Sequence, residues 1–310
     1  MARGLVIGEA LVDVVTGADG SDLGSHPGGS PANVALGLAR LEHDVRLLTW
    51  LGKDADGRLI TDHLEASGVT VVPGSSGAER TSIARAQLDA AGAATYDFDL
   101  QWRVEVTDVP TLTGPSGVDV VHTGSIAAIL RPGASTVESL LDRFVGHATI
   151  TYDPNARPAL MGEADVTLAK VFAYVETADV VKVSDDDLAW LYPDTDPIDI
   201  ADSWLMRGPS VVVVTRGVGG ADAVCRSGYV HLDAVTTDVV DTVGAGDAFS
   251  AGLIDGLSTA GLLGGLQRKA LRRVTPDTLI GALQQGLRVA AITCSRAGAD
   301  LPWRHELQPA

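Results

Sequence analysis

The segment Asp241–Gly252 combines residue types that can bind a phosphate group and move a proton. Gly244, Ala245 and Gly246 lack bulky side chains and lead directly into an acidic residue. Free N–H groups in the first turn of a helix form an anion site together with the positive end of the helix dipole. The acid, Asp247, is expected to stay ionised because the local field favours charge. These residues predict a base that takes a proton from a hydroxyl group attacking a bound phosphate.

A simpler interpretation of the same residues is an ordinary glycine-rich turn that Asp247 caps. The pattern nevertheless continues from Asp241 to Gly252, and at this length it resembles a signature of the ribokinase-like (PfkB) carbohydrate kinases. In that family the aspartate is the catalytic base, and the preceding backbone amides hold the transferred phosphoryl group. The resemblance therefore implies that Asp247 is the base and that residues 244–246 form the anion site.

The segment 26–35 tests this resemblance independently. A turn made by Gly28 and Gly29 precedes a helical pattern that carries Asn33 near its start. Asn33 suits a local helix cap, but its amide also offers donors and an acceptor to vicinal sugar hydroxyls. The segment resembles the first signature of the family, and the resemblance implies that Gly28, Gly29 and Asn33 contact the sugar. Glu42 departs from the family pattern, which usually has a glycine there.

Two further stretches resemble the β-lid that closes over the sugar in this family. Near-alternating residues predict a β-hairpin within residues 81–103, and residues 11–26 complete the lid. Closure would exclude water and so suppress hydrolysis of ATP. Phe98 is expected to pack against the sugar ring, to lie in the lid core or to contact a second copy. A homodimer formed through the lid is therefore one candidate assembly.

Of two acidic residues near the start of the chain, one is a candidate for the sugar site. Asp13 ends the first apolar segment, where such a residue often faces water at a sheet edge. The matching aspartate of the family accepts hydrogen bonds from sugar hydroxyls, which implies the same role for Asp13. Glu9 is expected to point the other way on an extended strand and is not assigned to the site.

A proline-bounded loop at residues 153–158 follows a predicted strand and should be rigid. One interpretation is a plain loop with a solvated arginine. The loop also resembles the DPNxR segment found near the phosphoryl-transfer point in sugar-kinase relatives. The resemblance implies that Asn155 binds substrate and that Arg157 clamps phosphate oxygens in the transition state.

The remaining motifs are expected to bind MgATP. Ser184 and Asp187 resemble the family's NxxE element, in which the acid holds Mg²⁺ through water, although an acidic first turn also complements a helix dipole. Gly246 is expected to contribute to the nucleotide site as well. The family's ATP loop has counterparts in Thr215, Gly217 and Gly220. Asp241 and residues 293–299 together form a candidate potassium site.

The composition favours a soluble enzyme. A chain of 310 residues with 45% hydrophobic content can bury a large core, and no apolar run approaches membrane length. The formal charge of −17 argues against nucleic acids and anionic membranes as partners. Cys225 and Cys294 are too few for a disulfide scaffold, so we expect a reduced, cytoplasmic setting.

Short apolar strands alternate with amphipathic helices along the chain. This rhythm predicts an α/β fold with a mainly parallel sheet covered by helices on both faces, as a single ribokinase-like domain of residues 1–310 with the lid inserted. Ligands in such folds lie beyond the carboxyl ends of the strands, where the motifs fall. The predicted strands are 4–8, 45–51, 118–122, 149–153, 180–183 and 210–215, and the predicted helices are 31–41, 57–66, 135–145, 185–191 and 247–258.

Together these features predict MgATP-dependent phosphorylation of a primary hydroxyl of a sugar. Residues 28–35 and 153–157 look most like the fructokinase branch, which implies conversion of D-fructose to fructose 6-phosphate. The alternatives are 2-keto-3-deoxygluconate kinase or another PfkB sugar kinase, and, from a different class, a catalytically idle sugar-binding regulator. A dinucleotide-dependent oxidoreductase lacks support because no GxGxxG pattern follows the first strand.

Overall fold

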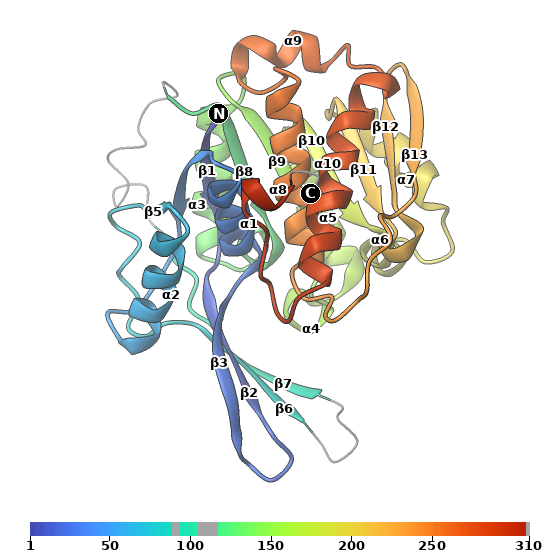
Figure 1. The fold of residues 1–310 in the computed structure, drawn as a ribbon. Coiled ribbons are helices and arrows are strands. Elements are labelled where there is room, and N and C mark those ends of the chain that lie inside the picture. Colours follow the sequence, from blue (N-terminus) through green and yellow to red (C-terminus); the bar gives the residue numbers. More distant parts are fainter. Residues whose placement is uncertain (89–93, 105–116, 308–310) are drawn as a thin grey trace.

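Nine strands form a large sheet at the centre of the main body (Figure 1). The computed structural model describes residues 1–88, 94–104 and 117–307. The strand order is β13-β12-β11-β10-β9-β8-β1-β4-β5, and neighbours from β11 to β5 pair in parallel. β12 and β13 add an antiparallel edge. The strands are β1 Arg3–Ile7, β4 Asp44–Leu48, β5 Val69–Val71, β8 Val120–Gly124, β9 Thr149–Asp153, β10 Val180–Ser184, β11 Val211–Thr215, β12 Ala221–Cys225 and β13 Gly228–Leu232.

Helices cover both faces of this sheet because successive side chains along each strand enter opposite apolar clusters. Leu5 and Ile7 of β1 pack with residues of α3, α5 and α7, whereas Val6 packs with residues of α1, α8 and α10. The predicted doubly covered, mainly parallel sheet is therefore confirmed. The helices are α1 Ser30–Arg40, α2 Ala55–Ala66, α3 Gly133–Phe144, α4 Pro158–Met161, α5 Ala164–Thr177, α6 Asp185–Leu191, α7 Pro197–Leu205, α8 Ala245–Thr259, α9 Arg268–Leu271 and α10 Pro276–Cys294.

All the predicted strands and helices have counterparts, although the strand predicted to reach residue 51 ends at Leu48. The antiparallel edge and the helices α5, α7 and α10 are not among the predicted elements. Small residues obscure α10, since Gly286 lets this helix approach α8 until a Cβ there would lie 3.0 Å from the ring of Phe249. Within the described parts of the chain, no helix has the length and apolar character needed to cross a bilayer.

A separate four-stranded sheet projects below the main body in Figure 1. Its order is β3-β2-β6-β7, with β2 and β6 parallel and the outer pairs antiparallel. The predicted hairpin is present as β6 and β7, and the predicted turn residues 89–93 lie outside the described residues. The strands of this small sheet are β2 Leu11–Thr16, β3 Asp22–Gly28, β6 Ile83–Leu88 and β7 Ala94–Asp99.

The chain enters and leaves the small sheet next to the main sheet. β1 ends at Ile7, so residues 8–10 connect the two sheets, and Asp13 is the third residue of β2. The expectation that Asp13 ends the first apolar segment is therefore wrong. On the return path Gly29 has a φ of 104°, and a Cβ there would lie 2.6 Å from the carbonyl oxygen of Glu9. Only glycine allows the two connections to cross at this distance.

Candidate active site

The first turn of α8 begins in a conformation that requires glycine. Gly244 caps the helix with a φ of 76°, and a Cβ at this position would lie 2.6 Å from that of Ala299. The amide of Ala245 already donates to the carbonyl of Thr242 at 3.2 Å. The amides of Gly246 and Asp247 follow in the same turn, where helix geometry provides no acceptor. Of the residues 244–246 predicted for the anion site, Ala245 therefore already has an acceptor for its amide within the chain.

The carboxylate of Asp247 joins α8 to the start of α1. Its Oδ1 accepts a hydrogen bond from Ser30 Oγ at 2.7 Å, and its Oδ2 accepts one from Asn33 Nδ2 at 2.8 Å. The residue is 6% exposed. Asn33 is not the helix cap, since Gly29 occupies that position. The structure thus brings two separately predicted segments together at one carboxylate, and adds Ser30, which the sequence did not indicate.

Burial raises the pKa of Asp247, and hydrogen bonds from Asn33 and Ser30 offset this only in part. The nearby charge of Asp153 raises the pKa further, whereas that of Lys182 lowers it. The direction is opposite to the one expected from the helix dipole, because desolvation of a buried charge outweighs the field of the helix terminus. A raised pKa makes the carboxylate a stronger base.

A buried ion pair next to Asp247 was missed by the sequence analysis. Lys182 in the middle of β10 contacts Asp153 at the end of β9, with 2.9 Å between Nζ and Oδ2. Burial opposes charge on Lys182, but Asp153 and Asp187 outweigh it and raise the pKa of the ammonium group. The same ammonium would lie 3.1 Å from a Cβ on Gly246. A lysine within a run of valines was the available signal, since such a residue stays buried only with a carboxylate partner.

Asp187 ties the loop after β9 to the start of α6. Its Oδ1 accepts from the amide of Ala156 at 2.9 Å, and it forms a reciprocal capping box with Ser184. Burial and the charge of Asp153 raise its pKa, while Lys182 lowers it. Asp187 thus lies in the acidic first turn of α6, as a complement to the helix dipole requires, and it also contacts the loop 153–158.

These residues fit a magnesium ion held through water. Three carboxylates, those of Asp153, Asp187 and Asp247, surround one ammonium group, so the cluster carries an excess of negative charge. Hard oxygen donors of this kind suit Mg²⁺, which keeps several of its waters. Among the described residues, no three His, Cys, Asp or Glu side chains are grouped so that they could hold a metal ion directly.

The loop 153–158 holds Arg157 at the surface. Asn155 has a positive φ of 38°, and its Oδ1 accepts from Arg157 Nη1 at 2.8 Å. The same Nη1 donates to the carbonyl of Ala156 at 2.9 Å. Burial raises the pKa values of Glu9 and Asp13, and the guanidinium is close enough for its charge to oppose part of each rise. Arg157 therefore faces the connection between the two sheets.

The predicted sugar-binding residues lie where the small sheet meets the body. Gly28 ends β3, and a Cβ there would lie 2.1 Å from Asp13 Oδ2, so its glycine leaves room for that carboxylate. Burial raises the pKa of Asp13 to about 6, although the charges of His26 and Arg157 oppose the shift. Phe98 on β7 is half-buried opposite Ala84. Gly28, Asp13 and Phe98 thus share the small sheet, while Asn33 comes from α1.

Glu9, which was not assigned to the sugar site, lies in the connection between the two sheets. Its side chain is 6% exposed and points into the body, where Oε2 accepts from the amide of Ala127 at 3.1 Å. Burial raises its pKa to about 7 despite a hydrogen bond from Ser125. The carbonyl of Ala127 accepts from Trp102 Nε1 at 2.9 Å, so the backbone of one residue anchors both the β1–β2 connection and the chain leaving β7. Glu9 is therefore part of the connection between the two sheets.

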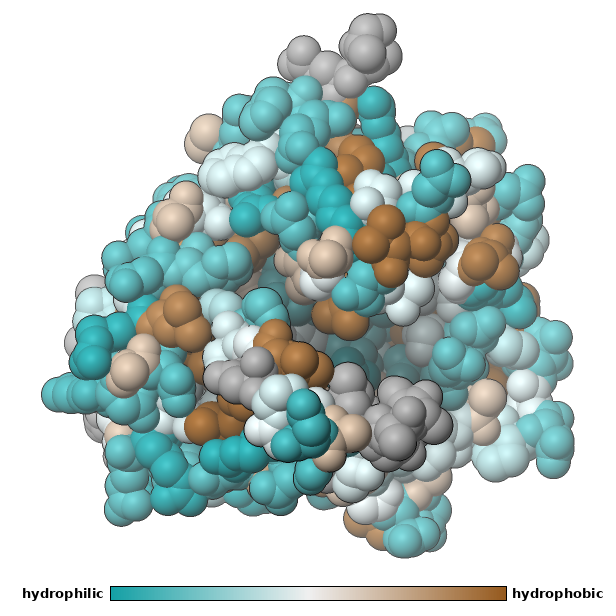
Figure 2. Space-filling view, turned by 60° about the horizontal axis from the view of Figure 1, so that its bottom comes forward, coloured by the Kyte–Doolittle hydropathy of each residue, from teal (hydrophilic) through white to brown (hydrophobic). Residues whose placement is uncertain are grey.

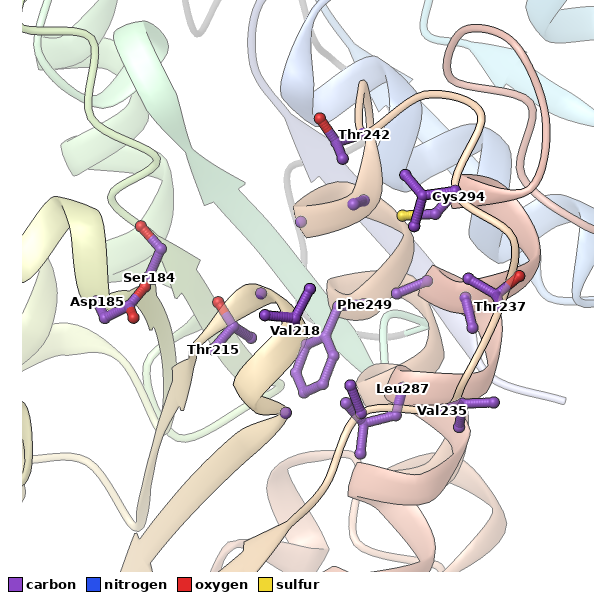
Figure 3. Close-up of a pocket in the computed structure, with 18 of the residues that line it drawn as sticks. Ser184, Asp185, Thr215, Val218, Val235, Thr237, Thr242, Phe249, Leu287 and Cys294 are labelled. Atoms are coloured by element: carbon purple, nitrogen blue, oxygen red, sulfur yellow. The ribbon is translucent and has the colours of Figure 1, made fainter.

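A cavity of about 580 Å³ lies beside the first turn of α8. Figure 2 views the end of the body from which the small sheet projects, and shows this face hollowed near its centre. Ser184 and Thr215 line one side, and Val235, Leu287 and Cys294 line the other (Figure 3). Other predicted site residues on its wall are Asn155, Asp187, Gly217, Gly220, Ala245 and Gly246. Charged groups gather at one end and apolar side chains at the other, as a nucleotide requires.

Asp241 stands at the far end of the segment that leads into α8. Its carboxylate accepts from the amides of Val243 at 3.0 Å and Gly298 at 2.8 Å, and these backbone hydrogen bonds lower its pKa. It therefore lies against residues 293–299, as expected for the candidate potassium site. Asp241 itself is not among the residues that line the cavity.

The family profile described as pfkB family carbohydrate kinase matches residues 1–306. A fructokinase from Rhizobium leguminosarum bv. trifolii is 32% identical over 280 residues, covering 86% of this chain and 85% of that protein. A fructokinase from Klebsiella pneumoniae is 32% identical over 309 residues, covering 98% and 97%. The structure of a double mutant of the fructokinase from Vibrio cholerae O395, with fructose, ADP and potassium ion bound, has a TM-score of 0.80 at 26% identity, covering 96% and 94%.

Proposed function

Because the chain belongs to the pfkB family of carbohydrate kinases, we propose that it transfers the γ-phosphate of ATP to a primary hydroxyl of a sugar. The observation that carries the proposal is the position of Asp247. Its carboxylate bonds to Asn33 from the side of the small sheet, while the adjoining Gly246 lines the large cavity. A base at this junction can reach a hydroxyl group on one side and a phosphate on the other.

In the proposed reaction Asp247 accepts the proton of the sugar hydroxyl as its oxygen forms a bond to the γ-phosphorus. The bond from that phosphorus to the bridging oxygen breaks, and ADP leaves. The amides of Gly246 and Asp247 and the ammonium of Lys182 are positioned to stabilise the transferring group. Asp187 would hold Mg²⁺ through water, and the ion would supply positive charge to the phosphate oxygens. Arg157 supplies a further positive group from the neighbouring loop.

We propose D-fructose as the substrate and fructose 6-phosphate as the product. The named fructokinases that resemble the chain over most of its length support this choice. Asp13 and Asn33, with Gly28, Gly29, Asn155 and Phe98 around them, are the proposed sugar contacts. The nucleotide is proposed to contact Ser184, Thr215, Gly217 and Gly220. A potassium ion near Asp241 is proposed on the position of its carboxylate, and the related Vibrio enzyme has potassium bound.

The small sheet is proposed to act as the lid of one kinase domain, moving about residues 8–10 and Gly29. Leu23 on β3 is 54% exposed and offers an apolar contact for a homodimer formed through this sheet. Cys225 and Cys294 are both free thiols, which agrees with the expected reducing, cytoplasmic location.

Coupled detection of ADP with a panel of sugars tests the function directly. Fructose should give the highest kcat/KM among fructose, ribose, glucose, adenosine and 2-keto-3-deoxygluconate. A clear preference for 2-keto-3-deoxygluconate or for the nucleoside would leave the kinase mechanism in place and reject fructose. Sugar binding without ATP turnover would favour an idle regulator and reject the kinase.

A further inference from the structure

Three side chains converge on the buried carboxylate of Asp222, on β12. The residue is 1% exposed. Its Oδ2 accepts from Arg216 Nε, while its Oδ1 accepts from the hydroxyl of Tyr229 at 2.5 Å and lies 2.8 Å from His231 Nδ1. Burial alone would raise the pKa of Asp222, but the hydrogen bonds from Tyr229, Arg216 and His231 outweigh it and lower the pKa. The ionised carboxylate therefore forms stronger hydrogen bonds with its three partners than a neutral acceptor would.

These partners belong to two segments that line the cavity. Arg216 begins the loop that continues through Gly217 and Gly220, both of which line the cavity. The other two partners lie on β13, and the chain that follows it lines the cavity at residues 234–237. The two walls also touch through their backbones, since a Cβ on Gly220 would lie 2.0 Å from the carbonyl oxygen of Leu232. Asp222 is therefore the side-chain link between two walls in direct contact.

We propose that Asp222 is a positioning residue that sets the affinity for ATP by fixing the spacing between residues 216–220 and residues 232–237. This inference rests on the proposed kinase function. None of Arg216, Asp222, Tyr229 and His231 is among the residues that line the cavity, so the cluster acts through the walls that it holds. When these segments are already held in the geometry that binds ATP, less conformational entropy is lost on binding and the affinity is higher. Buried ion pairs are better suited to setting geometry than to adding stability.

Two variants and one matched control test the proposal. Asp222→Asn should raise both KM and the calorimetric Kd for ATP about tenfold, the size of effect expected from losing a charged hydrogen bond. Its kcat at saturating ATP and its KM for fructose should stay within about twofold of the wild type. Tyr229→Phe keeps the carboxylate and removes one hydroxyl donor, so it should shift the same constants by about two- to threefold.

Asp255→Asn is the control, because Asp255 is also a buried carboxylate with several donors. It is 2% exposed and accepts from Gln285 at 2.6 Å and from Arg304 at 2.9 Å, and it is not among the cavity-lining residues. This variant should lose stability without a selective change in KM for ATP. Hydrogen exchange should show faster exchange in residues 216–220 and 232–237 together in Asp222→Asn, and in neither segment of Asp255→Asn.

The wild type separates the two claims that the experiment involves. Absence of ATP turnover with every sugar would overturn the proposed function itself. An active wild type with unchanged KM for ATP in Asp222→Asn would overturn only the role of Asp222. The role of Asp222 would also be overturned if Asp222→Asn raised both KM values and lowered kcat by similar factors, and Asp255→Asn did the same. If Asp222→Asn does not fold, Tyr229→Phe decides by the same criteria.

Discussion

Replacing Asp247 by asparagine should separate proton transfer from the architecture around it. The carboxylate accepts one hydrogen bond from Ser30 at 2.7 Å and one from Asn33 at 2.8 Å. Asparagine keeps one of these acceptors, and the hydroxyl of Ser30 can turn to accept from the new amide group. The net structural loss is therefore about one hydrogen bond, or roughly 1 kcal/mol. Removal of a buried charge compensates part of this loss, so the melting temperature should fall by only a few degrees.

The effect on the rate should be far larger than the effect on stability. A general base contributes about 10²–10⁴-fold, which corresponds to roughly 3–5 kcal/mol in the barrier. Because the amides of the first turn remain in place, ATP should bind with nearly unchanged affinity. The assay is coupled ADP detection at saturating ATP and fructose, with calorimetry for ATP and a thermal melt on the same preparation.

Asp255→Asn again provides the matched control, since Asp255 lies in the same helix and is equally buried. It should lower the melting temperature while kcat stays close to that of the wild type. A folded Asp247→Asn variant with kcat within about threefold of the wild type would refute the role of Asp247 as base. A parallel loss of kcat and ATP binding would show that the residue shapes the site rather than accepting a proton.

Gly246→Ala should lower kcat with little change in melting temperature, because a Cβ there would lie 3.1 Å from Lys182 Nζ. Gly244→Ala should mainly lower the melting temperature, because φ at this position is 76°. Equal changes in kcat and melting temperature for the two variants would contradict this contrast. KM for fructose should rise as pH falls through about 6, where Asp13 becomes protonated, and initial-rate profiles of Asp13→Asn should lack this rise. The pKa of Glu9 is about 7 against an ordinary 4.5, so its stabilisation is complete below about 4.5 and lost as pH rises through about 7. Between pH 5 and pH 8 the free energy of unfolding of the wild type should therefore fall by roughly 3 kcal/mol because of this group. Denaturant titrations of Glu9→Gln should lack this fall, and a pH dependence equal to that of the wild type would contradict the role of Glu9.

The sequence was most informative at positions where the backbone conformation restricts which residue can occur. Gly244 and Gly29 occupy conformations with positive φ, and their neighbours leave no room for a Cβ, so their residue types report the geometry directly. The valine-rich strand β11 was equally clear, because a strand buried on both faces reads as an unbroken apolar run. Such features depend on few residues close together in the chain, and for that reason they can be predicted.

Features that depend on contacts between distant segments could not be predicted in the same way. The buried position of Glu9 could not be predicted from strand alternation, because the chain leaves β1 at Ile7 and alternation does not continue through the connection. The ion pair of Lys182 with Asp153 joins residues 29 positions apart on adjacent strands. Nothing local in the sequence distinguishes these acids from the many exposed ones in a chain of charge −17.

The pKa shifts of the buried acids follow from burial and from their interactions with one another and with Lys182. Asp247 and Asp187 both have raised pKa values, for which burial and the charge of Asp153 are responsible, and Lys182 offsets part of each shift. Burial and Asp153 strengthen Asp247 as a base, while Lys182, Asn33 and Ser30 favour its ionised form. The excess negative charge is unfavourable for a bare phosphate but favourable for one that arrives with a divalent cation. The same imbalance therefore makes the proposed site depend on Mg²⁺ and gives Asp247 its strength as a base.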